Sequence, residues 1–482
     1  MIPIILSGCG GGNSSSIQSN SNRLFSSTPM LLPNLYTKYD RLCGDKTNVQ
    51  NMIPIDVNKD GRMDLVFNLW CSHQPFGDIY DGPVINSLIA LIQNSDGNFV
   101  DKTVEVFGTD YPDLGGTSNA ILVKDFNSDG YMDIIFAMSR EDGRGILNDD
   151  ISNHFAQNKA VMSNGNGKYT ITPIGTSTWN ASLSLIDNEV GTQDIWSTSF
   201  GPPGSEIYRY QNGWSVSKGD ARLGFGSLFF SRRNSESRSN ISTTPFLSDN
   251  IFGLSLLSRT DDLTSDWSLV SSYSYGTFTY VPWISWQLSE GSVPMLTING
   301  KDYVAVSLDS PCEISLIPGD PSSAVYKFTA NELIGGYQGG VVKEGTNMTP
   351  VAKIQVFDIT NNYLTLRQVV IKNEEVNSSD YRKSCGDVNG DGYDDIMIHD
   401  WRPDKKPIIY INDQSGGFAR VDYNVFPKTP YGSQSYVYMD IDGDGIRDIL
   451  YWPVASAWAG YPNVQYRIYK GLRNIDNTDI LK

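Results

Sequence analysis

Four short segments of the sequence carry carboxylates at a spacing that could bind a metal ion. Each follows the pattern D-x-[DN]-x-D-G-x-x-D and leads into three apolar or aromatic residues; the segments begin at Asp56, Asp125, Asp387 and Asp440. Ca²⁺ takes six to eight hard oxygen ligands at about 2.3–2.6 Å, whereas Mg²⁺ prefers a smaller octahedron and keeps its waters. The pattern therefore predicts calcium.

The predicted ligands occupy the same positions in all four segments. Side-chain oxygens at positions 1, 3, 5 and 9 and the backbone carbonyl at position 7 supply them, and glycine at position 6 permits the backbone reversal. They are Asp56, Asn58, Asp60, Arg62 and Asp64 in loop 1, Asp125, Asn127, Asp129, Tyr131 and Asp133 in loop 2, Asp387, Asn389, Asp391, Tyr393 and Asp395 in loop 3, and Asp440, Asp442, Asp444, Ile446 and Asp448 in loop 4. We expect about four structural calcium ions.

The elements around these loops are predicted to be strands. An EF-hand needs a bidentate Glu at position 12 and a helix on each side, but position 12 is apolar or aromatic here: Phe67, Phe136, Ile398 and Tyr451. β-branched and aromatic runs precede and follow each loop, as in 120–124 and 436–439. The loop therefore joins two strands, and the EF-hand is excluded.

A third strand and a turn follow, as in 88–100, 160–169 and 408–418. This unit resembles the FG-GAP/VCBS repeat of the integrin α-subunit β-propeller and of many bacterial surface proteins. The resemblance implies an all-β chain of four-stranded blades in a β-propeller with calcium-binding FG-GAP-type loops. It also implies that residues 28–50 complete the last blade as its outermost strand.

The spacing of the loops predicts seven blades. Neighbouring loop starts lie 69 and 53 residues apart, and a gap of 262 residues separates the two pairs. A degenerate copy without the central Asp-Gly is visible at 184–214, where we expect no calcium, and another at 295–306. Residues 220–292 are assigned a blade by arithmetic alone.

The first residues predict a membrane anchor. Leu6-Ser7-Gly8-Cys9 resembles the lipobox of a bacterial lipoprotein, which implies lipidation of Cys9 and a place in the bacterial cell envelope, at the outer membrane or cell surface. We expect a signal-peptide remnant at 1–9, a flexible Gly/Ser/Asn-rich tether at 10–27 and the propeller at 28–482. The translation start is expected upstream of Met1, because the apolar run is short and lacks a basic n-region. The alternative is a buried apolar N-terminus with an incidental cysteine.

Four further cysteines allow two disulfides in an exported protein. Cys43 and Cys71 flank loop 1, so we expect them to pair, which leaves Cys312 with Cys385. Four cysteines allow three connectivities, and free buried thiols are the alternative.

Composition limits the partners. The formal net charge is −17, and no cluster of Lys and Arg is present, which argues against nucleic acid as a partner. No segment other than the N-terminal one approaches the ~20 apolar residues of a membrane-spanning helix, so we expect contact with a membrane through the lipid anchor only.

A ligand is expected on the face opposite the calcium loops, where the connections after the second strands are rich in aromatic residues. The candidates are Trp70, His73, Tyr80, Trp401, Trp458 and Tyr461. We expect a protein or glycan ligand and no catalytic residue, because His73, His154 and His399 lie in no zinc or nucleophile motif. The alternative is a calcium-dependent carbohydrate-active enzyme, a glycosidase or polysaccharide lyase that uses carboxylates.

Overall fold

The computed structural model describes the chain in segments: residues 24–26, 28–33, 47–71, 86–140, 156–178, 180–187, 192–199, 205–219, 229–233, 238–242, 251–259, 268–282, 292–298, 301–308, 312–315, 324–334, 337–338, 341–342, 350–360, 363–369, 374–375, 382–393, 395–399, 408–414, 418–421, 435–452 and 467–472. Within these segments the fold is almost entirely antiparallel β, with one short helix, α2 (Thr103–Phe107). In the same segments no helix has the length and apolar character that a membrane crossing requires.

Five sheets have four strands each. The first sheet contains β2 (Thr47–Ile55), β3 (Asp64–Cys71), β4 (Asn86–Gln93) and β5 (Phe99–Asp101). The second contains β6 (Thr117–Lys124), β7 (Asp133–Arg140), β8 (Ala156–Ser163) and β9 (Tyr169–Thr178). The third contains β10 (Asn180–Asp187), β11 (Gln193–Ser199), β12 (Ser205–Tyr210) and β13 (Trp214–Lys218). The predicted loop–strand–turn units, including the degenerate copy, are confirmed as strands of these sheets.

Two more four-stranded sheets carry the other loops. The fourth sheet contains β27 (Arg382–Gly386), β28 (Asp395–His399), β29 (Ile408–Asn412) and β30 (Phe418–Arg420). The fifth contains β31 (Ser435–Met439), β32 (Asp448–Trp452), β33 (Arg467–Tyr469) and, at its edge, β1 (Met30–Leu31). In each loop-bearing sheet the Asp-rich loop joins the first and second strands. We call the side of the sheet where this loop joins the strand ends the loop end, and the side at the opposite ends of the strands the far end.

Eleven of the strands described between residues 229 and 375 form one large sheet where the spacing predicted two separate blades. Its strands are β14 (Phe229–Arg233), β15 (Arg238–Ser242), β16 (Ile251–Arg259), β17 (Ser268–Pro282), β18 (Ser292–Ile298), β19 (Lys301–Leu308), β20 (Cys312–Ser315), β21 (Ala324–Ile334), β24 (Pro350–Thr360), β25 (Tyr363–Val369) and β26 (Glu374–Glu375). A separate pair, β22 (Tyr337–Gln338) and β23 (Val341–Val342), lies outside it.

The long strand β17 explains this difference. It has 15 residues, and Thr277 pairs with Ile251 of β16 and with Thr297 of β18. A division into two blades would need a turn in this stretch, but the strand runs on without one. Residues 295–306, predicted as another copy of the repeat, lie in the hairpin β18–β19 of the large sheet and not in a separate four-stranded sheet. Five four-stranded sheets are thus described, and the count of seven blades stays a prediction.

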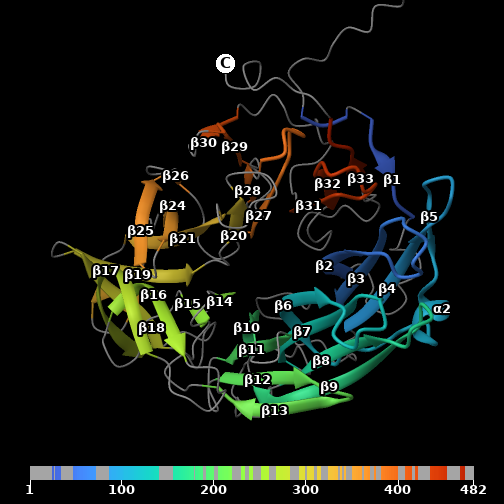
Figure 1. Cartoon of the computed structure of the whole chain (residues 1–482), viewed down its shortest axis with the longest axis horizontal. Coiled ribbons are helices and arrows are strands. Elements are labelled where there is room, and N and C mark those ends of the chain that lie inside the picture. The colour runs from blue at the N-terminus through green and yellow to red at the C-terminus, as the bar shows by residue number, and fades with distance from the viewer. Residues whose placement is uncertain are drawn as a thin grey trace, which may run out of the picture.

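Figure 1 shows the sheets set around a common centre, with the first strand of the first three sheets nearest to it and the fourth strand outermost. Neighbouring sheets share hydrophobic contacts because side chains on successive strand residues point to opposite faces. In β3, Leu65 and Phe67 pack with Leu450 of the fifth sheet, whereas Val66 packs toward the second sheet. Both faces are therefore buried, which is why the sequence after each loop is continuously apolar.

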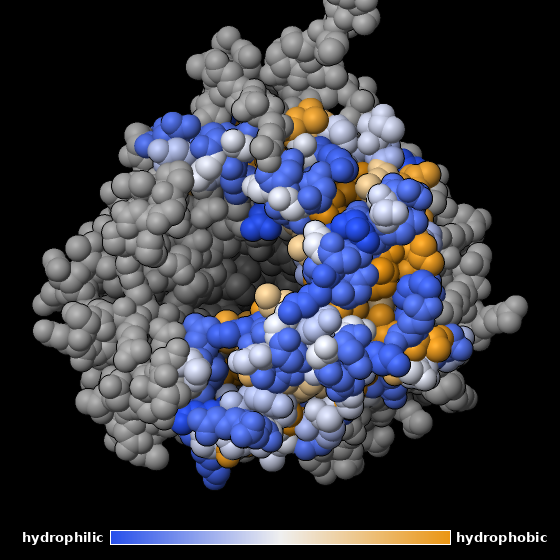
Figure 2. Space-filling model, turned by 45° about the vertical axis from the view of Figure 1, so that its right-hand side comes forward, coloured by the Kyte–Doolittle hydropathy of each residue, from blue (hydrophilic) through white to orange (hydrophobic). Residues whose placement is uncertain are grey.

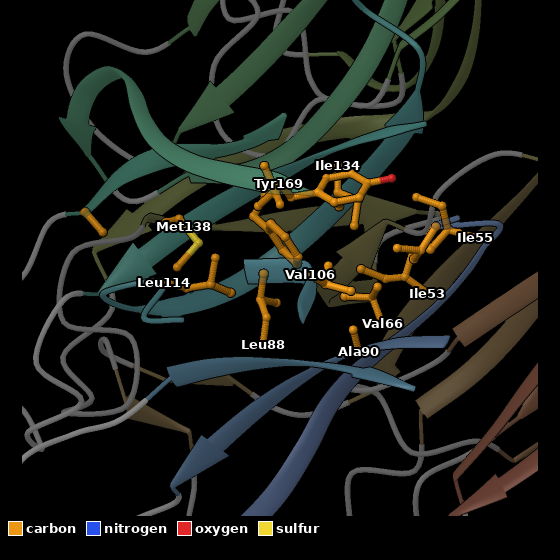
Figure 3. Packing of buried hydrophobic residues seen from close by; sticks show 14 residues of the cluster. Ile53, Ile55, Val66, Leu88, Ala90, Val106, Leu114, Ile134, Met138 and Tyr169 are labelled. Carbon is orange, nitrogen blue, oxygen red and sulfur yellow. The ribbon is translucent and has the colours of Figure 1, made fainter. Parts of the chain in front are cut away.

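The contact between the first and second sheets is drawn in Figure 3. Val66 and Leu88 of the first sheet face Ile134 and Met138 of the second, with Val106 of α2 between them. A second interface of this kind joins the second sheet to the third. Figure 2 shows a hollow beside the described sheets, and the described residues on this face are mainly hydrophilic.

The N-terminal segment completes the fifth sheet, as expected for part of residues 28–50. Met30 pairs with Ile468 and Leu31 with Arg467. Before β1, Phe25 forms a bridge with Gly471, and the Leu472 amide donates to the Leu24 carbonyl at 2.9 Å. Leu24 and Phe25 are fully buried. The predicted tether, 10–27, therefore extends too far, because residues 24–26 already pack on the sheet.

Phe25→Ala is expected to destabilise the folded state by about 3–5 kcal/mol, because it removes a fully buried aromatic side chain and leaves a cavity. Chemical denaturation measures the change in the free energy of unfolding. Leu31→Ala is the control, since Leu31 is 51% exposed in the same segment and its loss costs little. Equal losses for the two variants would contradict the packing of the N-terminal segment described here.

Candidate metal-binding loops

The carboxylate at position 1 organises each loop. In loop 1 the amides of Asp60 and Gly61 donate to the two oxygens of Asp56, at 3.1 and 2.9 Å. The same two bonds recur in the other loops, at 3.2 and 2.8 Å to Asp125, 3.2 and 2.7 Å to Asp387, and 3.0 and 2.8 Å to Asp440. Four separate stretches of sequence therefore fold into one loop structure.

Two residues in each loop adopt left-handed backbone conformations. Glycine at position 6 has φ between 83° and 87° in all four loops, as the pattern predicted. Position 4 is also left-handed, with φ of 59° at Lys59 and 60° at Ser128. The pattern did not predict this second reversal, although Gly390 and Gly443 at position 4 of loops 3 and 4 were a signal for it.

The ligand set at positions 1, 3 and 5 is brought together. At position 5, Asp60 and its three counterparts each accept the position-7 amide, at 2.8–2.9 Å. In loop 4, oxygens of Asp440, Asp442 and Asp444 all lie within 4.8 Å of one another. All donors are hard oxygens, which fits calcium and not a thiophilic ion. The roles of the position-7 carbonyls, in Arg62, Tyr131, Tyr393 and Ile446, stay predictions.

Position 9 differs from the other positions, because its carboxylate is buried and already bonded on both oxygens. In loop 1, Asp64 is 0% exposed; its Oδ2 accepts the Val57 amide at 2.9 Å and its Oδ1 the Gln93 amide at 2.8 Å. Asp133, Asp395 and Asp448 make the equivalent pairs of bonds. Position 9 therefore ties the loop to the third strand of its own sheet. Each oxygen keeps a second lone pair with which it could bind a metal.

Burial changes the acidity of these position-9 groups. It raises the pKa of Asp64 and of Asp133 to about 6 and that of Asp448 to about 7, with neighbouring loop carboxylates adding to the shift and the amide bonds opposing it. Burial likewise raises the pKa of Asp395 well above its ordinary range. A cation in the loop would favour the charged form of each group.

Loops 1 and 2 touch each other. The Lys59 ammonium lies 4.7 Å from the centre of the Tyr131 ring, a cation–π contact. The turn after β8 also reaches both loops, since a Cβ at Gly165 would be 3.6 Å from the Asp129 carboxylate and one at Gly167 would be 3.4 Å from the Val57 carbonyl. The loop ends of the first and second sheets are thus in contact with each other.

A buried polar cluster links the second and third sheets, and no sequence motif indicated it. Asn158 donates to the hydroxyls of Ser197 and Tyr208, both at 2.9 Å, and accepts the Met138 amide at 2.9 Å. The Tyr208 hydroxyl donates to Glu206 at 2.8 Å. Burial raises the pKa of Tyr208 well above its usual range, so the phenol stays protonated. These groups satisfy one another, which makes the cluster a structural link.

The remaining predicted positions are only partly described. His73, Tyr80, Trp401, Trp458, Tyr461, Cys9 and Cys43 lie outside the described residues, as does His154. For Trp70, Cys71, Cys312 and Cys385 the structure describes the backbone alone. Cys71 ends β3, while Cys312 in β20 and Cys385 in β27 lie on neighbouring strands. The disulfide pairing stays a prediction.

Comparison with known proteins identifies the repeat. The family model of the FG-GAP-like repeat matches residues 56–136 and 387–451, which contain all four loops. No curated protein matches the chain.

Solved structures resemble the chain at a low level. They include a polysaccharide lyase, Uly1 (11% identity, 95% of this chain and 98% of that chain, TM-score 0.39). Others are a putative exo-β-1,3-galactanase from Bifidobacterium bifidum (10%, 72% and 97%, TM-score 0.30) and an endo-1,4-β-xylanase from Bacteroides thetaiotaomicron (9%, 72% and 100%, TM-score 0.27). These are likenesses between chains in which about nine residues in ten differ.

The raised pKa values of the position-9 groups predict how stability depends on pH when a chelator keeps the loops free of metal. An acid with a higher pKa in the folded state binds more protons when folded. Its stabilising contribution is therefore fully present only below about pH 4, where the unfolded aspartate is also protonated, and is lost progressively as the pH rises to about 6–7. We expect the Tm in chelator to fall between about pH 4 and pH 7. A Tm that rises across this range would contradict the burial of these carboxylates.

Proposed function

We propose that this FG-GAP repeat protein is a calcium-stabilised, non-enzymatic binding protein of the bacterial cell envelope, held at the membrane through lipidated Cys9, and that it binds a protein or glycan. The repeated geometry of the four loops carries the calcium part of this proposal. Loss of metabolic palmitate labelling in a Cys9→Ser variant is the expected result for the anchor.

Calcium would neutralise charges that the fold places together. Each loop collects three or four carboxylates, and hydrogen bonds from the loop's own amides hold them in place. The ion would be held by Asp56, Asn58 and Asp60 in loop 1 and by their counterparts in the other loops. The carboxylate at position 9 would complete the set of ligands. The ion would supply local charge balance and rigidity, with no role in catalysis.

The position of the loops favours an architectural role. Each lies between the first and second strands of its sheet and is bonded to the third strand through position 9. A cation bound there would therefore fix three strands relative to one another. We propose on this ground that the sheets form a β-propeller. The five four-stranded sheets would be five of its blades, and the strands of residues 229–375 would stand in place of the other two of the seven.

The far end is the proposed ligand face. At the loop end of the first sheet, β4 and β5 are joined by the short turn 94–98. At the far end, β3 and β4 are joined by 72–85, β7 and β8 by 141–155, and β32 and β33 by 453–466. Long connections on a rigid scaffold are where binding residues concentrate. The aromatic candidates belong to 72–85, to 453–466 or to 400–407 between β28 and β29, or border one of them.

Asp129→Ala is expected to lower stability by about 1–3 kcal/mol in about 10 mM calcium, if the loops bind with the 10⁻⁴–10⁻³ M constants typical of extracellular modules. In chelator its Tm is expected to stay close to that of the unaltered protein. Thermal unfolding in both conditions measures this. Asp96→Ala, in the exposed turn after β4, is the control and should respond equally in both. Equal losses for Asp129→Ala in calcium and chelator would mean that loop 2 holds no metal.

The ligand is tested with a glycan array and a pull-down on the chain without its lipid, compared with Trp458→Ala and Trp401→Ala. We expect binding that these far-end variants reduce at least about tenfold, as for aromatic anchors of an interface, and that Asp129→Ala leaves intact in calcium. A screen for polysaccharide hydrolysis or elimination runs in parallel. Turnover that a single carboxylate substitution outside the four loops abolishes would overturn the non-enzymatic assignment.

A further inference from the structure

The fifth sheet is closed without a covalent connection between its outer two strands. In the first, second and fourth sheets the third strand continues through a turn into the fourth. In the fifth sheet the strand beside β33 is β1, from the opposite end of the chain. Contacts with residues 467–472 must therefore hold residues 24–31 in place.

Lys470 lies between loop 4 and the N-terminal segment. Its ammonium donates to Asp442 Oδ2 at 2.8 Å. Its backbone exchanges two hydrogen bonds with Ser26: the Lys470 amide donates to the Ser26 hydroxyl at 3.0 Å, and the Ser26 amide donates to the Lys470 carbonyl at 2.8 Å. The next residue repeats this arrangement, since the Gly471 amide donates to Asp448 at 2.7 Å and Gly471 is bridged to Phe25. Lys470 and Gly471 therefore each contact both a carboxylate of loop 4 and the N-terminal segment.

Asp442 is the residue at which loop 4 departs from the other loops. Position 3 is Asn in loops 1–3, and its side-chain amide donates to the position-5 carboxylate at 2.9, 3.1 and 3.0 Å. Asp442 cannot donate in this way when ionised, and it gives loop 4 a fourth carboxylate. Lys470 supplies a donor and a positive charge to Asp442 from the end of the third strand, whereas in loop 1 the cation beside the carboxylates is Arg62 of the loop itself, which pairs with Asp60.

The third sheet also has a basic residue on its third strand, opposite the aspartate that corresponds to position 9. The pairing of Ile195 with Tyr208 places Asp194 opposite Arg209, and the pairing of Ile449 with Tyr469 places Asp448 opposite Lys470. Arg209 binds both oxygens of the buried Asp194, at 2.9 and 2.8 Å. The residues at this register in the first, second and fourth sheets are Ile92, Met162 and Ile411. Among the described sheets, a basic residue occurs here only where the loop departs from the Asn-containing pattern.

We propose that Lys470 is a resident cation of loop 4 that holds the loop and residues 24–31 together without metal, and that calcium in loop 4 reinforces the same contact. The first half stands without the proposed calcium function, and the second half rests on it. By linkage, docking of the N-terminal segment and calcium binding at loop 4 strengthen each other. The segment that would lead to the membrane anchor is then fastened by the same carboxylates that hold the ion.

The test compares Lys470→Met with Lys470→Arg in the full chain. Methionine already occupies this register in the second sheet, so the strand is expected to accept it. Amide hydrogen exchange of residues 24–31 is measured in chelator and in calcium. In chelator, Lys470→Met is expected to reduce protection about three- to fivefold, the effect of one ion pair near the surface, whereas Lys470→Arg keeps it. Calcium is expected to restore protection in Lys470→Met.

Lys102→Met is the control, because it removes a lysine with an exposed ion-pair partner, Glu105, away from loop 4. It should leave exchange at residues 24–31 unchanged. Unchanged protection of Lys470→Met in chelator would overturn the role of Lys470. Protection that calcium does not restore, while calcium still raises the Tm, would overturn the link to the metal. If calcium changes neither Tm nor exchange in the unaltered protein, the calcium function fails and the result in chelator still decides the role of Lys470.

Discussion

The buried carboxylate at position 9 is the interaction on which the loop-bearing sheets depend. In the first sheet, Asp64 accepts one amide from its own loop and one from the end of β4. This single side chain therefore fixes the position of the loop relative to the third strand. Burial without partners would be costly for a carboxylate, and the two amides offset that cost. A change at position 9 would release the loop and the strand together.

Each loop is held both by its own residues and by its sheet. Position 1 shapes the loop, position 9 attaches it to the sheet, and the cation–π contact of Lys59 with Tyr131 joins loop 1 to loop 2. The sheets themselves are held by apolar faces on both sides, as Leu65 and Val66 show by pointing into different clusters. Polar contacts order the loop ends, and hydrophobic contacts hold the sheets to one another.

One of the described sheets is completed in a different way from the others. The fifth sheet takes its edge strand from the N-terminal residues, so its completion joins parts of the chain more than 400 residues apart. Closing a segment of this length costs chain entropy, which contacts at the junction must offset. Buried Phe25 and the bonds of Lys470 and Gly471 are those contacts. The loop carboxylates thereby take part in closing the fold.

The sequence by itself determined the loops, the strands beside them and the positions of the glycines at Gly61, Gly130, Gly392 and Gly445, because these depend on local spacing and backbone sterics. Local pattern also located the degenerate unit that forms the third sheet. Tertiary structure alone decided the second bond of Asp64 to Gln93, the pairing of Asp194 with Arg209 and the place of Lys470, because each joins residues on different strands whose register is set by packing. It also decided that β17 continues without a break in the large sheet, because its pairing with β16 and β18 determines its length. No residue type in this stretch indicates where the strand ends.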